Sequence, residues 1–158
     1  MIRRIVVGID GSPGSQAALR WALAEARLRR LTLHVVHAWE LPLTPGGAGP
    51  YVVLGRPPED SPKLDEIELA VQQEAGRVVD EALGEVEGEA ADVEIEREVV
   101  QEAAPQALLR ASAGAELLVV GSRGRGGFAG LLLGSVSQQC AHHATCPVVV
   151  VRPGGGNS

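Results

Sequence analysis

The chain has 158 residues, and 14 lysines and arginines stand against 20 aspartates and glutamates. This length suits one domain with a proper hydrophobic core. The formal net charge of −6 argues against a nucleic-acid partner, because basic patches are needed to bind phosphate backbones.

No stretch reaches the roughly 18–20 apolar residues of a membrane span, and the first residues show no leader pattern. Two cysteines, Cys140 and Cys146, are too few for a disulfide scaffold. We therefore expect a cytoplasmic protein with reduced thiols.

Short apolar runs alternate with helical patterns along the chain. Residues 5–9 form a first buried strand that ends at Asp10-Gly11, and residues 31–39 form a second. Between them, Ser12-Pro13 is typical of a helix N-terminus. The helix that follows has apolar residues at spacings of four, three and four, and we interpret them as its core-facing stripe: Ala17, Trp21, Ala24 and Leu28.

The middle of the chain is interrupted by a segment rich in proline. Residues 41–60 hold five of the ten prolines and predict a long connecting loop rather than a second domain. A helix is predicted to begin at Ser61-Pro62 and to end at Gly84. Residues 93–100 alternate between one face with Val93, Ile95, Arg97 and Val99 and another with three glutamates, which indicates an edge or half-exposed strand. Pro105 lies in the first turn of a further helix.

The last third of the chain predicts a strand over 116–120, a helix over 136–143 and a final strand over 147–151. We expect residues 1–152 to form a single domain and the glycine-rich residues 153–158 to form a flexible tail. Continuous apolar strands that alternate with helices predict an α/β fold. It is a Rossmann-like open sheet of five parallel strands with helices on both faces, and we expect the strand order 3-2-1-4-5.

Ligands of such sheets bind beyond the carboxyl ends of the strands. Asp10, Ala38-Trp39 and a glycine-rich loop all follow predicted strands. If the first and fourth strands are neighbours, these three features converge on one crevice.

The glycine-rich loop is the most informative motif. It reads Gly121-Ser122-Arg123-Gly124, nine residues, then Gly134-Ser135, and it joins a predicted strand to a predicted helix. Glycines let backbone N–H groups approach an anion, and a helix N-terminus adds unpaired N–H groups and the positive end of the dipole. The loop therefore predicts a bound nucleotide. Arg123 and Arg125 form a basic cluster of about the right size for a triphosphate.

Other nucleotide and catalytic motifs do not fit. A Walker A loop needs a lysine, and Lys63 is the only one in the chain. A relaxed dinucleotide fingerprint, Gly124-x-Gly126-x-x-Ala129, does not lie in the first strand–helix turn, and no acidic residue ends a strand about 20 residues later. The histidines do not form a metal site, because neighbours in sequence point to different sides. No nucleophile and base are paired, so at most slow ATP hydrolysis is expected, from positioning by the loop.

At this loop the chain resembles the universal stress protein family, and the resemblance covers almost its whole length. It also includes Val7 to Ser12, His37-Ala38 and the closing run Cys146 to Val150. The spacing Gly, two residues, Gly, nine residues, Gly-Ser is that of the ATP-binding branch. The resemblance implies an adenine nucleotide such as ATP, with Mg²⁺ arriving on its phosphates. It also implies a homodimer paired through the last strand, Val148–Val151.

The resemblance also implies roles for single residues. Asp10 would lie near the ribose and adenosine, and the backbone of Ala38 would contact the adenine ring. Ser135 and the N–H of Val136 would hold phosphate. The motif glycines would surround the ribose and phosphates: Gly121, Gly124 and Gly134.

Each of these residues also has a purely structural interpretation. Asp10 suits a turn ahead of a Ser12 cap, and Ser135 begins the capping-box pattern Ser-x-x-Gln138. Arg123 suits a solvated loop, and Trp39 suits either packing or a place near the base.

The function expected first is that of an ATP-binding stress-response protein acting as a nucleotide-dependent sensor or regulator. The alternatives are a slow ATPase or nucleotidyl transferase, a cyclic-nucleotide binder, and a nucleotide-free dimeric interaction module. No nucleic acid and no membrane is expected as a partner.

Overall fold

The computed structural model describes residues 3–41, 64–124 and 132–154. These residues contain a five-stranded sheet of order β3-β2-β1-β4-β5, and every neighbouring pair of strands is parallel. The predicted strand order is confirmed. The strands are β1 (Arg4–Gly8), β2 (Thr32–Trp39), β3 (Ile95–Gln101), β4 (Leu117–Gly121) and β5 (Val148–Val151).

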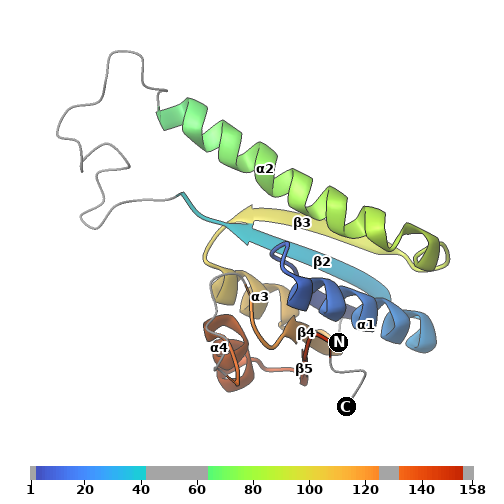
Figure 1. Ribbon diagram of the computed structural model, residues 1–158. Coiled ribbons are helices and arrows are strands. Elements are labelled where there is room, and N and C mark those ends of the chain that lie inside the picture. The colour runs from blue at the N-terminus through green and yellow to red at the C-terminus, as the bar shows by residue number, and fades with distance from the viewer. Residues whose placement is uncertain (1–2, 42–63, 125–131, 155–158) are drawn as a thin grey trace.

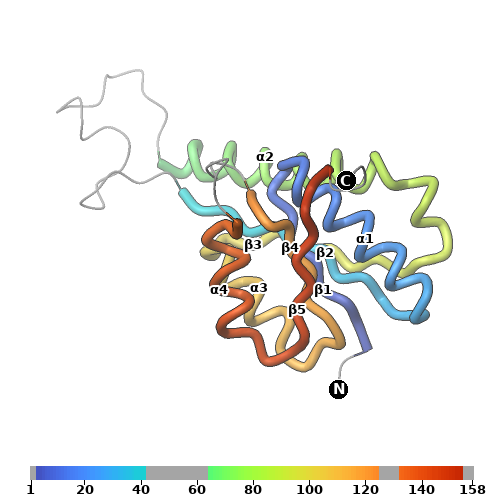
Figure 2. Tube along the Cα trace, turned by 60° about the horizontal axis from the view of Figure 1, so that its bottom comes forward, coloured from blue at the N-terminus to red at the C-terminus, as the bar shows by residue number. Residues whose placement is uncertain are grey.

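Helices cover both faces of the sheet (Figure 1). Helix α1 (Pro13–Arg29) and helix α2 (Leu64–Glu85) pack on one face, and α3 (Ala104–Ser112) and α4 (Ser135–His143) pack on the other. Figure 2 looks along the sheet and shows α3 and α4 on the side opposite α1. A single 3₁₀ turn, η2 (Glu87–Glu89), follows α2. This layering is the α/β architecture expected from the alternation of strands and helices.

The central strand explains why the strands read as continuous apolar runs. Ile5, Val6 and Val7 of β1 are all fully buried. Ile5 and Val7 point into the layer under α1 and α2, whereas Val6 points into the layer under α3 and α4. Because a parallel sheet is covered on both sides, successive residues of its central strands must all be apolar.

The predicted core-facing stripe of α1 is wrong. The buried face is instead formed by small and branched residues, and Trp21 and Leu28 are 37% and 77% exposed. Two apolar stripes at helical spacing run along this helix, and periodicity alone cannot choose between them. The alanine-rich stripe lies against the sheet because small side chains let the helix approach closely. Its members are Ala18, Leu19, Ala22, Leu23 and Ala26.

The two edge strands of the sheet differ in how far their residues are buried. β3 forms one edge, and Val99 on it is exposed, which confirms the prediction of an edge strand. Helix α2 is buried only in its second half, from Ala75 onward, while Leu64 at its start is exposed. The first turns of α2 accordingly extend beyond the sheet (Figure 1). β5 forms the other edge, and its four valines are half-buried.

Some predictions concern residues outside the described ranges. They are the connecting loop predicted over 41–60, from residue 42 onward, the helix start at Ser61-Pro62, Arg125, and the tail from residue 155 onward. In the ranges that are described, no helix is long and apolar enough to cross a membrane.

Candidate functional site

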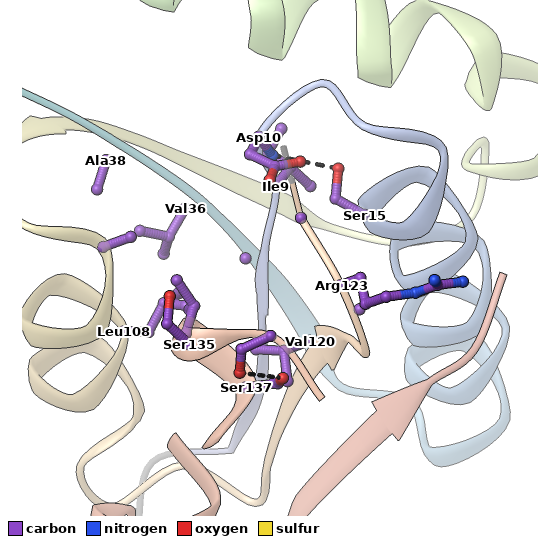
Figure 3. Close-up of a pocket in the computed structure, with 16 residues that line it drawn as sticks. Ile9, Asp10, Ser15, Val36, Ala38, Leu108, Val120, Arg123, Ser135 and Ser137 are labelled. Carbon is purple, nitrogen blue, oxygen red and sulfur yellow. Dashed lines mark hydrogen bonds between the residues drawn. The ribbon is translucent and has the colours of Figure 1, made fainter. Parts of the chain in front are cut away.

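A cavity of about 310 Å³ opens at the carboxyl ends of β1, β2 and β4, between those ends and helices α3 and α4 (Figure 3). It lies at the switch point of the sheet, where β1 leads to strands on both sides. All eight residues selected from the sequence line it: Asp10, Ala38, Gly121, Arg123, Gly124, Gly134, Ser135 and Val136.

Asp10 is held in the turn between β1 and α1 by its neighbours. One carboxylate oxygen, Oδ1, accepts a hydrogen bond of 2.9 Å from the N–H of Ser12. The N–H of Asp10 donates to Oγ of Ser15 at 3.1 Å, and the N–H of Ser15 donates to Oγ of Ser12, the N-cap residue, at 3.2 Å. Gly11 has φ of 83°, which favours glycine. The structural and functional interpretations of Asp10 are thus compatible, because the turn that uses Oδ1 also places the side chain at the cavity.

Gly124 lies directly against that carboxylate. A Cβ atom built on Gly124 would come within 2.4 Å of Oδ2 of Asp10, a separation that real Cβ atoms do not show. A side chain at this position would have to displace the carboxylate of Asp10. The close approach brings the backbone after β4 next to the acidic group after β1.

A second close approach joins this loop to α1. A Cβ on Gly121 would lie 2.9 Å from the carbonyl carbon and oxygen of Gly14, and a Cβ on Gly14 would lie 2.6 Å from the carbonyl oxygen of Arg123. The backbones of the loop and of the first turn of α1 are thus in direct contact. Gly14 was not selected from the sequence, because nothing local to it shows what it packs against.

Hydrogen bonds hold the start of α4 beside the end of β4. The N–H of Gly134 donates to the carbonyl of Ser122 at 2.6 Å, and the hydroxyl of Ser137 donates to the same carbonyl at 3.1 Å. The N–H of Ser122 in turn donates to the carbonyl of Val151 in β5 at 2.8 Å. These bonds fix both described ends of the glycine-rich loop and direct the N-terminus of α4 to the cavity.

The predicted capping role of Ser135 is wrong. The N-cap of α4 is Gly134, Ser135 is the first helical residue, and no side chain caps this end. The side chain of Gln138 donates instead to the carbonyl of Leu133 at 3.2 Å. The hydroxyl of Ser135 is left exposed at the cavity.

Arg123 lines the cavity, but its side chain extends away from Ser135 and Val120 toward the α1 side (Figure 3). In this conformation the guanidinium does not point to the place where the helix N-terminus would hold an anion. Contact between Arg123 and phosphate stays a prediction.

The opposite end of the cavity is apolar. Val36 and Ala38 of β2 share one face of the strand and line this end (Figure 3). Leu108 and Ala104 of α3 also line the cavity. Leu108 occupies the space that Gly8 leaves free, since a Cβ on Gly8 would lie 2.7 Å from its Cδ1 atom. The cavity thus has an apolar part at the ends of β2 and α3 and a part with backbone N–H groups and hydroxyls at the start of α4.

The family model described as the universal stress protein family matches residues 1–152. The chain belongs to this family.

Relatives with the same name come from mycobacteria. Universal stress protein Rv2005c of Mycobacterium tuberculosis is 42% identical over 148 residues, which cover 94% of this chain and 45% of the relative. A universal stress protein of Mycolicibacterium smegmatis is 39% identical over 150 residues, again 94% of this chain and 45% of the relative. This chain therefore spans about half the length of the curated relatives it matches.

Solved universal stress proteins share the fold. UspA of Lactobacillus plantarum superposes with a TM-score of 0.75 at 19% identity and covers 96% of this chain and 99% of its own, which shows the fold alone. A universal stress protein in complex with cAMP gives 0.66 at 26% identity, with 96% and 98% covered. The protein of Archaeoglobus fulgidus in complex with dAMP gives 0.62 at 25% identity, with 96% and 99% covered.

Several residues lining this universal stress protein's cavity were missed. Val36 was within reach of sequence reasoning, because it lies two residues before Ala38 and shares its face of the strand. Ala104, Leu108 and Ser15 were not, since only the packing of α3 and the start of α1 brings them to the cavity. Trp39, considered near the base, does not line the cavity; its carbonyl accepts from the N–H of Glu102 at 3.1 Å.

Neither cysteine is among the residues that line the cavity. Cys140 is fully buried, and burial raises its pKa to about 11, with a smaller contribution from Cys146. A thiol with so high a pKa stays protonated and unreactive at neutral pH. Within the described ranges, no three His, Cys, Asp or Glu residues are grouped so as to hold a metal ion.

Proposed function

We propose that this universal stress protein domain binds an adenine nucleotide in the cavity, with ATP as the first candidate. The observation that carries the proposal is the meeting of Asp10, Gly124 and the start of α4 around one cavity. These groups come from opposite ends of the chain, and only a parallel sheet of this order brings them together.

The two parts of the cavity suit the two parts of a nucleotide. The apolar part between Val36, Ala38 and Leu108 suits a flat base. Asp10 suits the ribose, because a carboxylate accepts hydrogen bonds from hydroxyl groups. The backbone around Gly134 and Ser135 suits phosphate, because a helix N-terminus presents N–H groups and a positive dipole. Mg²⁺ would arrive with the phosphates of ATP, since it is usually held by phosphates and few protein oxygens.

A specific observation favours cyclic or monophosphate nucleotides as the second candidate. The solved universal stress proteins in complex with cAMP and dAMP are 26% and 25% identical to this chain and share its fold. Furthermore, the guanidinium of Arg123 points away from the start of α4, so one fewer positive charge faces the phosphate end (Figure 3). A ligand with fewer phosphates needs less positive charge.

The wider role proposed is that of a cytoplasmic stress-response sensor or regulator in which the bound nucleotide changes the surface offered to partners. A homodimer paired through β5 is part of this proposal, because an exposed edge strand of four valines invites pairing. A slow ATPase and a nucleotide-free interaction module remain the rivals. The first requires Mg²⁺-dependent turnover, and the second requires that loop variants keep full activity in cells.

Nucleotide extraction tests the proposal first. The purified protein is denatured, and the released nucleotide is identified by chromatography. Calorimetric titrations of nucleotide-free protein with ATP, ADP, AMP and cAMP, each with and without Mg²⁺, then rank the ligands. Saturable binding of an adenine nucleotide supports the proposal, and its absence for all four ligands with the protein folded overturns it.

A further inference from the structure

His34 is a buried titratable group at some distance from the cavity mouth. It is paired in register with Val6 of β1 and Glu96 of β3, so it lies on the face of the sheet that α3 covers. The residue as a whole is only 7% exposed, and Nδ1 of the ring has no hydrogen-bond partner among the described residues. The other ring nitrogen, Nε2, lies 3.5 Å from Oε1 of Glu98.

The carboxylate of Glu98 is shared between His34 and α3. Its second oxygen, Oε2, accepts a hydrogen bond of 2.6 Å from Nη2 of Arg110. Arg110 also donates to Oε1 of Glu102, from Nη2 at 3.1 Å and from Nε at 3.2 Å. Arg110 thus ties the last turn of α3 to the edge strand β3 through the same carboxylate that faces the histidine.

A second arginine holds α3 from the other side of His34. Nη2 of Arg4 in β1 donates to the carbonyl of Ala111 at 2.7 Å, and Nη1 lies 3.8 Å from Oε2 of Glu96. The charged groups that act on the imidazole are therefore two cations, one from β1 and one from α3, and two carboxylates from β3: Arg4, Arg110, Glu96 and Glu98.

Helix α3 is also a wall of the proposed nucleotide cavity. Ala104 and Leu108 line the cavity, and Leu108 fills the space beside Gly8. The arginine contacts at Arg110 and Ala111 lie within three residues of Leu108. A loss of these contacts would consequently let α3, and with it Leu108, move away from the sheet.

We propose that His34 is an acid-sensitive lock, and that its protonation releases α3 from the sheet and thereby opens the wall of the nucleotide cavity. A neutral imidazole can donate from Nε2 to Glu98 and leave Nδ1 as a bare lone pair. An imidazolium has two donors, but Nδ1 has no acceptor among the described residues, and Glu98 already accepts from Arg110. A buried donor without an acceptor is costly, and the new charge also repels the two arginines that hold α3.

The direction of the pH effect follows from the surroundings. Burial and, after it, the charge of Arg4 lower the pKa of His34 below its usual 6.5, against the opposite effects of Glu98 and Glu96. The unfolded chain therefore takes up this proton at a higher pH than the folded chain does. The stability linked to His34 is unaffected above about pH 6.5 and is lost as the pH falls below that value.

The test compares the protein with His34→Gln, which cannot titrate yet can still donate to Glu98. His142→Gln on the exposed side of α4 is the matched control. Amide hydrogen exchange of α3 is followed without nucleotide from pH 8 to pH 5, corrected for the intrinsic pH dependence of exchange. In the protein and in the control, the opening equilibrium of α3 should rise by up to about tenfold per pH unit below 6.5. In His34→Gln the opening equilibrium of α3 should not change with pH over this range. Equal pH dependence in all three would overturn the proposal.

A second variant keeps the test independent of how well the first one folds. Glu98→Gln removes a charge that raises the pKa of His34, so the imidazole NMR titration of His34 should shift to lower pH. A His34 that titrates near 6.5 in the protein and in Glu98→Gln contradicts the lock.

The effect on ligand rests on the proposed function and is measured separately. Nucleotide affinity should fall with the acid step in the protein and not in His34→Gln. Exchange that shows the acid step in a protein that binds no nucleotide leaves the lock standing and rejects the proposed function. Nucleotide binding by a protein whose α3 exchange does not depend on acid supports the proposed function and rejects the lock.

Discussion

Gly124 and Asp10 are in contact across the carboxyl end of the sheet: a Cβ atom on Gly124 would lie 2.4 Å from Oδ2 of Asp10. One residue follows β4 and the other follows β1, so their contact joins the glycine-rich loop to the first turn of the chain. The contact sets the position of the acidic group at the mouth of the cavity. A larger residue at position 124 would have to displace this carboxylate.

Gly124→Ala should therefore weaken nucleotide binding while leaving the fold intact. The methyl group must displace the carboxylate of Asp10 or the loop backbone, and Gly124 itself is exposed, so the core is not disturbed. We expect a loss of affinity of at least about tenfold, equivalent to about 1.4 kcal/mol, by calorimetric titration. Gly76→Ala is the matched control, because nothing lies within 4 Å of a Cβ there. Equal affinities in the two variants would contradict the assignment of the contact to the binding site.

Gly14→Ala should reduce stability rather than binding alone. Its Cβ would lie 2.6 Å from the carbonyl oxygen of Arg123, and a backbone atom cannot rotate away as a side chain can. Overpacking of this kind costs about 1–3 kcal/mol of unfolding free energy. Urea denaturation measures it. Gly84→Ala, in a helix with nothing within 4 Å, should instead be neutral or stabilising by up to about 1 kcal/mol.

The two roles of Asp10 can be separated by substitution. Asn keeps an oxygen for the N–H of Ser12, so Asp10→Asn should preserve stability, whereas Asp10→Ala should lose about 1 kcal/mol with the turn. Both variants lose the charged acceptor and should bind nucleotide more weakly. Urea denaturation and calorimetric titration of the same samples distinguish the two effects. If the Asp10→Asn protein binds nucleotide with unchanged affinity, Asp10 has only its structural role in the turn.

The sequence predicted the sheet well because its central strands are buried on both faces and α1 begins at a recognisable cap, Ser12. It predicted the cavity residues that follow strands, such as Asp10 and Gly124, because the carboxyl ends of parallel strands must meet. It could not predict Leu108, whose place depends on how α3 packs, or Gly14, whose neighbour is more than a hundred residues away. It also chose the wrong face of α1, since Trp21 and the buried alanines both have helical spacing.

The buried thiol of Cys140 should make stability fall at alkaline pH. Burial raises its pKa from 9.0 to about 11, so the unfolded chain releases this proton at a lower pH than the folded chain. The linked stability is unaffected below about pH 9 and is lost as the pH rises toward 11. Thermal unfolding of the protein and of Cys140→Ala from pH 8 to pH 10.5 checks this. The variant should be less stable at pH 8, and its stability should decline less steeply above pH 9.

The proposed β5 dimer makes a prediction about single backbone groups. The carbonyl of Pro147 accepts from the N–H of Leu118, and the carbonyl of Val151 accepts from the N–H of Ser122. The backbone groups of alternate residues of β5 therefore face β4, and the backbone N–H of Val150 faces the open edge of the sheet. Proline is tolerated on edge strands where its missing N–H would face outward. Val150→Pro should therefore keep the fold and lose the dimer, whereas Val149→Pro should break the pairing with β4 and lower stability. Analytical ultracentrifugation and thermal unfolding separate the two variants. A Val150→Pro protein that still dimerises would place the interface elsewhere, because pairing through β5 needs the outward N–H of this residue.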